Sequence, residues 1–342
     1  MRHFKWIGGL ALAGLLLLEP RAAAAGAARA MAHWYAAVAP AVFPFLALMP
    51  LLTCEAAARA YERLLGRWMN ALFDLPGAAA PALVIGMVGG SPAGALAARR
   101  LAGEADMRRR ELWHAAVAAA GFSPAFLVGS IGAGMLGDAA LGWRLAIAQL
   151  TAQLALALLL RWAWRGRAQA VRVVAPADGA DPARGMSPVR GAVLTVLTIG
   201  GYMALFGALA GVAGAYLGGD AANVLLCLLD VPSGARLVAA LPVAMETRLV
   251  MLSAMCGFGG ACVIAQNLGA LRGCGMNAME YVALRVLAAG IGAAAMALQR
   301  TLGQWDGLRL IDAVRTRPLA AAGLCAALLS VPALVRLKKS IS

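Results

Sequence analysis

Long, nearly unbroken runs of Ala, Leu, Val and Gly dominate this chain of 342 residues. Hydrophobic residues make up 62% of the sequence and charged residues only 13%, whereas soluble domains carry about 25% charged residues. Several runs approach the roughly 20 apolar residues that a helix needs to cross a bilayer. A soluble fold could not bury that much apolar surface. The sequence therefore predicts an all-α, polytopic integral membrane protein with about eight spans.

Gly and Pro interrupt two of the apolar stretches, 72–98 and 222–245, which sets them apart from simple spans. We expect these two to re-enter the membrane as broken hairpins rather than cross it. The other stretches are expected to be spans, and they cover residues 6–20, 33–53, 112–136, 141–160, 191–217, 249–271, 277–298 and 318–335.

The spans and loops group into five regions along the chain. The start resembles a secretory signal, because two basic residues precede an apolar run and an AxA site follows at 23–25. We favour an uncleaved span that looks like a signal anchor, because further spans follow it. The expected regions are this N-terminal span (1–30), a first repeat with its return span (31–160), a basic cytoplasmic loop (161–190), a second repeat (191–300) and a C-terminal span with a basic tail (301–342).

The net charge of +14 comes from basic residues that gather between the apolar stretches. In a soluble protein such a charge would suggest nucleic-acid binding. Here it fits cytoplasmic loops, so no nucleic-acid partner is expected. The inner side then holds both termini, 55–70, 99–110 and 161–190, while the outer side holds 137–140 and 218–222. The mixed segment 300–317 falls outside despite its basic residues, and it is expected to lie along the interface.

The two halves of the chain carry matched breaks. Gly90-Ser91-Pro92-Ala93-Gly94-Ala95 is followed by Gly121-Phe122-Ser123-Pro124, and Val231-Pro232-Ser233-Gly234-Ala235 is followed by Gly257-Phe258-Gly259-Gly260. By the charge pattern the first unit begins with an outside-to-inside span and the second with an inside-to-outside span. They are therefore expected to be inverted repeats, which in transporters place a binding site where broken helices meet near the midplane.

A helix broken in hydrocarbon leaves N–H and C=O groups unpaired, at a cost of several kcal/mol each. Such a break persists only when it is buried in protein or lines a polar cavity. The alternative is close packing, since Gly86, Gly90 and Gly94 at i, i+4 and i+8 could form a small-residue face. Four breaks in two matched pairs favour a cavity.

At these residues the sequence resembles the sporulation integral membrane protein YlbJ family, which is built from paired nucleoside-recognition (gate) domains. The resemblance covers roughly residues 15–300. It is carried by Phe43-Pro44-Phe45, Gly86-Met87-Val88-Gly89-Gly90-Ser91-Pro92-Ala93-Gly94-Ala95, Phe122-Ser123-Pro124-Ala125-Phe126, Val231-Pro232-Ser233-Gly234, and Gly257-Phe258-Gly259-Gly260 with Gln266. The sequence departs from the family pattern at two places. At Ser123 the family usually has Ser-Asn-Pro-like polarity, and at Asp230-Val231-Pro232 it usually has Glu and Thr.

The resemblance implies a gate-like fold in both repeats and a role in endospore development, in cortex formation. It also implies a multi-pass location in the cell membrane, in a sporulating cell the mother-cell or forespore-surrounding membrane. The ligand is not something the resemblance supplies.

The hairpin tips and the breaks are the expected ligand-binding positions. Half-helix N-termini there would offer free N–H groups to an anion or a polar ligand. The alternatives are packing or back-bonding for the serines, capping for Asp230, interhelical hydrogen bonding for Gln266 and snorkelling for Arg285. The candidate residues are Ser91, Pro92, Gly94, Ser123, Asp230, Ser233, Gly234, Gly259, Gln266 and Arg285.

No catalytic motif occurs in the sequence, so we expect no enzyme activity and no catalytic residues. The six cysteines form no CxxC pair and only three histidines are present, so neither a metal site nor a cofactor is expected. We expect a membrane protein that binds or transports a small polar or anionic solute through an inverted-repeat gate. Its partners would be the lipid bilayer, that solute and spore-envelope proteins. The alternative is a non-transporting membrane scaffold for spore-envelope assembly.

Overall fold

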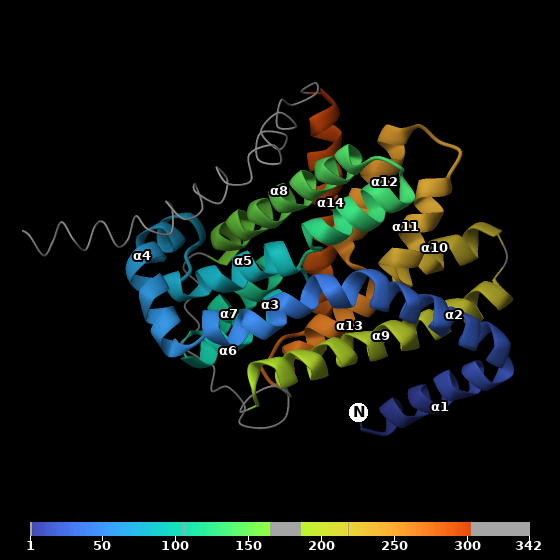
Figure 1. Cartoon of the computed structure of the whole chain (residues 1–342), viewed down its shortest axis with the longest axis horizontal. Coiled ribbons are helices and arrows are strands. Elements are labelled where there is room, and N and C mark those ends of the chain that lie inside the picture. Colours follow the sequence, from blue (N-terminus) through green and yellow to red (C-terminus); the bar gives the residue numbers. More distant parts are fainter. Residues whose placement is uncertain (1, 105–106, 165–185, 218, 302–342) are drawn as a thin grey trace, which may run out of the picture. The chain divides into compact units, whose positions relative to one another are not determined.

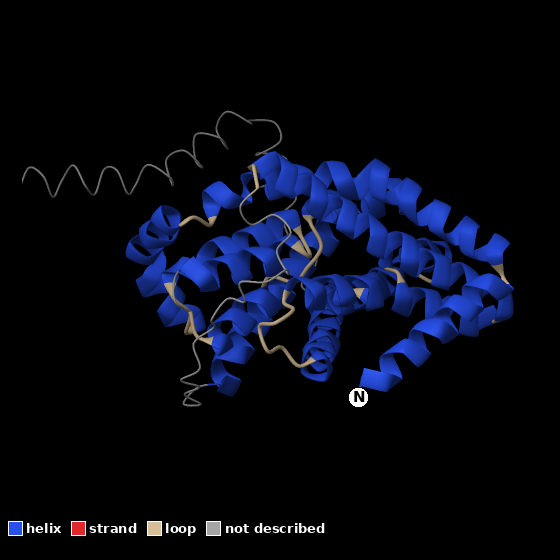
Figure 2. Cartoon of the chain, turned by 90° about the horizontal axis from the view of Figure 1, so that it is seen from below, coloured by secondary structure: helices blue, strands red, loops and turns tan. Residues whose placement is uncertain are grey.

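The computed structural model describes residues 2–104, 107–164, 186–217 and 219–301, and these ranges form helices joined by loops and turns (Figures 1 and 2). No strand occurs within them, which confirms the all-α prediction. The chain divides into two compact units, Met1–Ala297 and Leu298–Ser342. Most of the predicted loop 161–190, nearly all of the segment 300–317 and the predicted last span 318–335 lie outside the described residues.

The first half contains a long helix, a helical hairpin, a broken helix and a long return helix, preceded by an N-terminal helix. The elements are α1 (Arg2–Leu18), α2 (Pro20–His33), η1 (Trp34–Val38), α3 (Ala39–Leu52), α4 (Glu55–Phe73), η2 (Gly77–Ala79), α5 (Ala80–Gly89), α6 (Ala93–Glu104), α7 (Arg109–Ala118), η3 (Ala125–Met135) and α8 (Ala139–Trp164).

The second half repeats this order with its own long helix, hairpin, broken helix and return helix. Its elements are α9 (Pro188–Tyr216), α10 (Gly219–Leu229), α11 (Val231–Ala240), α12 (Met245–Phe258), α13 (Gly260–Ala270) and α14 (Ala278–Thr301). The hairpins are α5–α6 and α10–α11. The broken helices are α7–η3 and α12–α13.

Five helices in the described residues are long and apolar enough to cross a membrane, or six if the bent pair of 55–73 and 77–89 counts as one span. The five cover Pro20–Leu52, Ala139–Trp164, Pro188–Tyr216, Met245–Ala270 and Ala278–Gln299. The expected first span is a shorter apolar helix at Gly9–Leu18, and the expected span 112–136 is interrupted between α7 and η3.

The predicted second span, 33–53, coincides with the second part of a longer helix. Helix α2 continues through η1 into α3 as a single run from Pro20 to Leu52. Pro20 lies in the first turn of α2, where the helix needs no N–H from it, while Pro40, Pro44 and Pro50 lie inside the continuous run. Membrane helices tolerate such prolines because neighbouring groups pair the freed carbonyls.

Small residues bring α2 and α9 into backbone contact. A Cβ added at Gly207 would lie 2.5 Å from the Cβ of Ala30 and 2.8 Å from the carbonyl oxygen of Gly26. Gly211, one turn further along α9, also approaches α2, and a Cβ there would lie 3.2 Å from the Cα of Gly26. This is the close approach that small residues permit between membrane helices.

Polar contacts join the two halves of the chain at both ends of the compact unit formed by residues 1–297. At one end Arg99 of α6 donates to the carbonyl of Ala270 at 2.9 Å, and the Trp113 indole donates to the carbonyl of Cys274 at 3.2 Å. At the other end the Arg144 guanidinium makes two hydrogen bonds to the Glu246 carboxylate, at 2.8 and 2.7 Å. The two halves of the chain thus contact one another through polar groups at two places.

The two hairpins approach from opposite ends of the long helices. In Figure 1, α5, α6 and α7 lie toward the end of the first unit that holds α4, and α10, α11 and α12 lie toward the other end. This arrangement places the two hairpin tips in the middle of the unit, which is the layout expected of inverted repeats.

Candidate functional site

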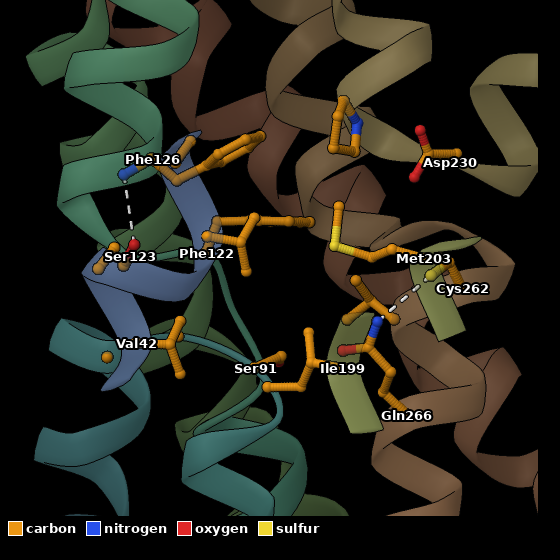
Figure 3. A pocket seen from close by; sticks show the side chains of 17 residues that line it. Val42, Ser91, Phe122, Ser123, Phe126, Ile199, Met203, Asp230, Cys262 and Gln266 are labelled. Carbon is orange, nitrogen blue, oxygen red and sulfur yellow. Dashed lines mark hydrogen bonds between the residues drawn. The ribbon is translucent and has the colours of Figure 1, made fainter. Parts of the chain in front are cut away.

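A cavity of about 50 Å³ lies where the two hairpins and the two broken helices meet (Figure 3). Its lining comes from both halves of the chain: Ala37, Val38, Ala41, Val42, Gly89, Gly90, Ser91, Phe122, Ser123, Phe126, Ile199, Met203, Asp230, Pro232, Cys262, Val263 and Gln266. Four of the predicted site residues, Ser91, Ser123, Asp230 and Gln266, are brought together here although about 175 residues separate the first from the last.

The first hairpin tip is held by the backbone. Gly90 ends α5 with a φ of +77°, a conformation that glycine adopts without steric cost. The Ser91 N–H then donates to the carbonyl of Gly121 at 2.8 Å, which fastens the tip to the break between α7 and η3. The Ser91 hydroxyl oxygen is buried and has no hydrogen-bond partner among the described residues. It is therefore available to a molecule in the cavity.

The second hairpin tip is held by a carboxylate. Asp230, which is 2% exposed, is the N-cap of α11. Its Oδ2 accepts hydrogen bonds from the Ser233 N–H at 3.1 Å and from the Ser233 hydroxyl at 2.6 Å. The capping alternative is thus realised, and Ser233 acts on the cap without lining this cavity. Asp230 lines it all the same, so one residue both caps the half-helix and faces the space.

The breaks in the two spanning helices supply the remaining polar groups. In the first half the Ser123 hydroxyl accepts from the Phe126 N–H at 3.3 Å, at the start of η3. In the second half Gly259 and Gly260 have φ values of +92° and +69° and separate α12 from α13. On α13 the Gln266 amide donates to the Cys262 sulfur at 3.2 Å, within its own helix (Figure 3).

Arg285 lies outside the lining of the cavity and pairs the carbonyls at both breaks. It is 3% exposed, and its guanidinium donates to the carbonyls of Ala120 at 2.5 Å, Phe258 at 3.1 Å and Cys256 at 3.5 Å. These carbonyls follow α7 or end α12, where no intrahelical partner remains and a cation is favoured. Arg285 thus points to the helix breaks and does not reach out of its span toward the membrane surface, as snorkelling would require.

The other predicted site residues serve packing. A Cβ on Gly94 would lie 2.7 Å from both the carbonyl oxygen of Ala119 and the Cα of Gly86. A Cβ on Gly234 would lie 2.6 Å from the Cα of Cys227. Pro92 is buried beside Ser91, and Gly259 lies against the Arg285 guanidinium. These residues hold the backbones of the hairpins and the break in place.

Sequence reasoning missed the apolar part of the lining, which comes from residues on α3, η3 and α9. Val42 precedes the Phe43-Pro44-Phe45 motif, and Phe122 and Phe126 flank Ser123-Pro124, so motif proximity was an available signal for these three. Ile199 and Met203 lie in an ordinary apolar span with nothing to distinguish them. Only the packing of α9 against the first half places them at the site.

An apolar wall with a few convergent polar groups is the usual lining of a small-molecule site. The volume is far below the roughly 300 Å³ at which such sites begin, and it corresponds to a few water molecules. The space is therefore too small for anything larger than a very small solute. Within the described residues no group of three His, Cys, Asp or Glu side chains could hold a metal ion.

Comparison with known proteins supplies one relative. The chain is 27% identical over 300 residues to the sporulation integral membrane protein YlbJ of Bacillus subtilis (strain 168). The aligned region covers 77% of this chain and 74% of that protein. No family model matches the chain, and no solved structure matches it. The apolar helices and the similarity to an integral membrane protein identify a multi-pass membrane protein. The resemblance to the sporulation integral membrane protein YlbJ family is thereby confirmed.

Proposed function

We propose that this protein binds and moves a small polar or anionic solute through the cavity between its two hairpin tips, and that it acts in endospore development. One observation carries the proposal. Both hairpin tips, the first helix break and helix α13, four segments far apart in sequence, line a single cavity that contains a hydroxyl without a partner and a buried carboxylate. Such convergence of broken helices is how transporters with inverted repeats build their sites.

The similarity to a sporulation protein supports the proposed role in endospore development. Cortex formation is the process that the family resemblance implies, and a solute needed there would have to cross a membrane around the forespore. The small volume favours a solute much smaller than a nucleoside, unless the hairpins separate when it binds.

A complementation assay tests the proposal in a spore-forming host that lacks its own relative. Asp230→Asn removes a negative charge that faces the cavity, and Ser91→Ala removes a hydroxyl that faces it. Thr198→Ala is the matched control, because its exposed hydroxyl bonds only to the Leu194 carbonyl of its own helix. We expect the control to restore cortex formation and the cavity variants to fail at normal expression. Full restoration by both cavity variants would refute the proposal.

The scaffold alternative predicts a different pattern in the same assay. A scaffold that recruits spore-envelope enzymes through its cytoplasmic side would tolerate the cavity variants. It would lose function when residues 165–185 are replaced by a Gly/Ser linker of equal length. A thermal-shift screen of small polar solutes on the purified protein, with the wild type and Asp230→Asn side by side, would then identify the solute.

A further inference from the structure

A second cavity, of about 200 Å³, lies beside the first and shares two residues with it, Asp230 and Pro232. It is four times larger, and α2, α9, α10 and α11 enclose it. Its lining consists of Gly26, Arg29, Ala30, His33, Gly207, Ala210, Leu226, Asp230, Pro232, Ser233, Arg236 and Leu237. Two arginines and a histidine in one cavity of a membrane protein are costly unless something compensates them.

His33 is the buried polar group of this cavity. The side chain is 9% exposed, and its Nε2 is buried without a hydrogen-bond partner among the described residues. The ring meets Phe126, which lines the first cavity, edge to face at 5.8 Å between centroids. Because an unpaired buried polar atom costs about 1–3 kcal/mol, its persistence at a cavity wall points to a partner that binds there.

Arg29 and Arg236 supply positive charge from opposite walls, one on α2 and the other on α11. Both side chains are exposed, and neither makes an ion pair or hydrogen bond within the described part of the chain. Asp230 is the one carboxylate of the lining, and its Oδ2 is already engaged by Ser233. His33 lies within electrostatic range of both Arg236 and Asp230.

We propose that this second cavity is an oxyanion-binding site, in which Arg29 and Arg236 bind a phosphate or carboxylate group and His33 hydrogen-bonds to it. The guanidinium fork matches the geometry of such groups and pairs with them through two hydrogen bonds. The group could belong to a free anion or to a lipid headgroup, since both present the same oxygens. The proposal requires binding alone and holds whether or not the protein transports a solute.

The site is tested by thermal stability of the purified full-length protein in a phosphate-free maltoside detergent. Inorganic phosphate is one probe, and a short-chain phosphatidylglycerol, which carries the headgroup, is the other. The variants are Arg29→Gln, Arg236→Gln and both together. Arg190→Gln is the matched control, because Arg190 is exposed near the start of α9 and lies outside the cavity. All the replaced side chains are exposed, so the fold should survive.

We expect the wild type and Arg190→Gln to be stabilised by phosphate in a concentration-dependent way. The apparent affinity should fall about tenfold in each single variant and further in the double variant, as expected for loss of a charge-assisted hydrogen bond. Stabilisation by the lipid alone, with the same loss in the variants, supports the site and assigns it to a headgroup. An undiminished response in the double variant, or no response of the wild type to either probe, overturns the proposal.

His33→Phe provides a second test of the same site. It keeps an aromatic ring against Phe126 and removes the ring nitrogens. We expect unchanged or higher stability without phosphate, because an unpaired buried group is removed, and a weaker response to whichever probe stabilises the wild type. A response equal to that of the wild type would remove His33 from the site.

Discussion

The two hairpins of this protein share one layout but differ in burial. In α5–α6 most side chains are enclosed, and Ala82, Ala93 and Ala97 are each 0% exposed. In α10 only Ala222 is buried, while Val224 and Leu228 are 59% and 48% exposed. Because these exposed residues are apolar, they face lipid in a membrane protein. The first hairpin is therefore enclosed along both of its helices, whereas the second is held mainly through α11, of whose residues half are buried.

The hairpin tips also differ in how their polar contacts hold them. The first tip is fastened by a backbone hydrogen bond from Ser91 to Gly121, across to another element. In the second tip the Ser233 N–H and hydroxyl donate to Asp230, within one turn of its own helix. A tip whose polar contacts are internal can move as a unit without breaking them. We therefore expect α10–α11 to be the moving element and α5–α6 the fixed one.

The largest effect should appear in side-specific labelling, which tests the membrane sides predicted for two connecting segments. A cysteine at Asp138 should react only with a membrane-impermeant thiol reagent added outside. A cysteine at Arg172 should react only from inside, because the basic loop is predicted to be cytoplasmic. Labelling of both positions from the same side would contradict inverted repeats. A background without the native cysteines is the control.

Leucine at either of the two packed glycines should lower the free energy of unfolding, by different amounts in the two hairpins. In Gly94→Leu the new side chain meets Ala119 and Gly86 in the enclosed hairpin, so we expect a loss of about 3 kcal/mol or more. In Gly234→Leu it meets the backbone of Cys227 on α10, a mostly exposed helix that can move away from α11, so we expect about 1 kcal/mol. Membrane insertion should survive in both, because leucine raises hydropathy. Unfolding in detergent gives the ranking, and the reverse ranking would break the comparison.

Two substitutions of Asp230 should distinguish the contribution of its capping hydrogen bonds to stability from that of its charge. Asp230→Ala removes the acceptor for Ser233 and should cost about 1 kcal/mol. Asp230→Asn keeps an acceptor at the same place and should cost a few tenths of a kcal/mol. Thermal unfolding of both variants measures the difference. Equal losses would show that the charge, rather than the cap, holds the second tip.

The smallest effect on stability is expected for Ser91→Ala. The Ser91 hydroxyl has no partner to lose, so the free energy of unfolding should change by less than about 0.5 kcal/mol. Loss of function at unchanged stability would then locate its role in the cavity. A clear loss of stability would show that the hydroxyl has a structural partner after all.

The elements that the sequence predicted well are those marked by glycine and proline. Gly90 and Gly259–Gly260 break their helices through positive φ values, which few other residues adopt, and so the hairpin and the break were visible before any packing was known. The continuous helix from Pro20 to Leu52 was not, because proline in a membrane helix need not end it.

The candidate site was predictable only at its tips. Ser91 and Asp230 follow from the breaks, whereas Ile199 and Met203 join them because α9 packs against the first half. Arg285 stood out as an intramembrane charge, yet its partners are backbone carbonyls at two distant breaks, which no local pattern specifies. Likewise Arg29, His33 and Arg236 look unrelated in sequence and share a cavity only through the fold.

The central claim is that both hairpin tips meet at one cavity, and cross-linking tests it most directly. Ser91→Cys and Pro232→Cys are combined in a background without native cysteines, with a protease site inserted in the loop at 165–185. A short bifunctional thiol reagent is added before cleavage. We predict that the cross-link holds the two halves together as one band, while either cysteine alone lets them separate. Separation in the double variant, although each cysteine reacts with a monofunctional reagent, would contradict the shared cavity.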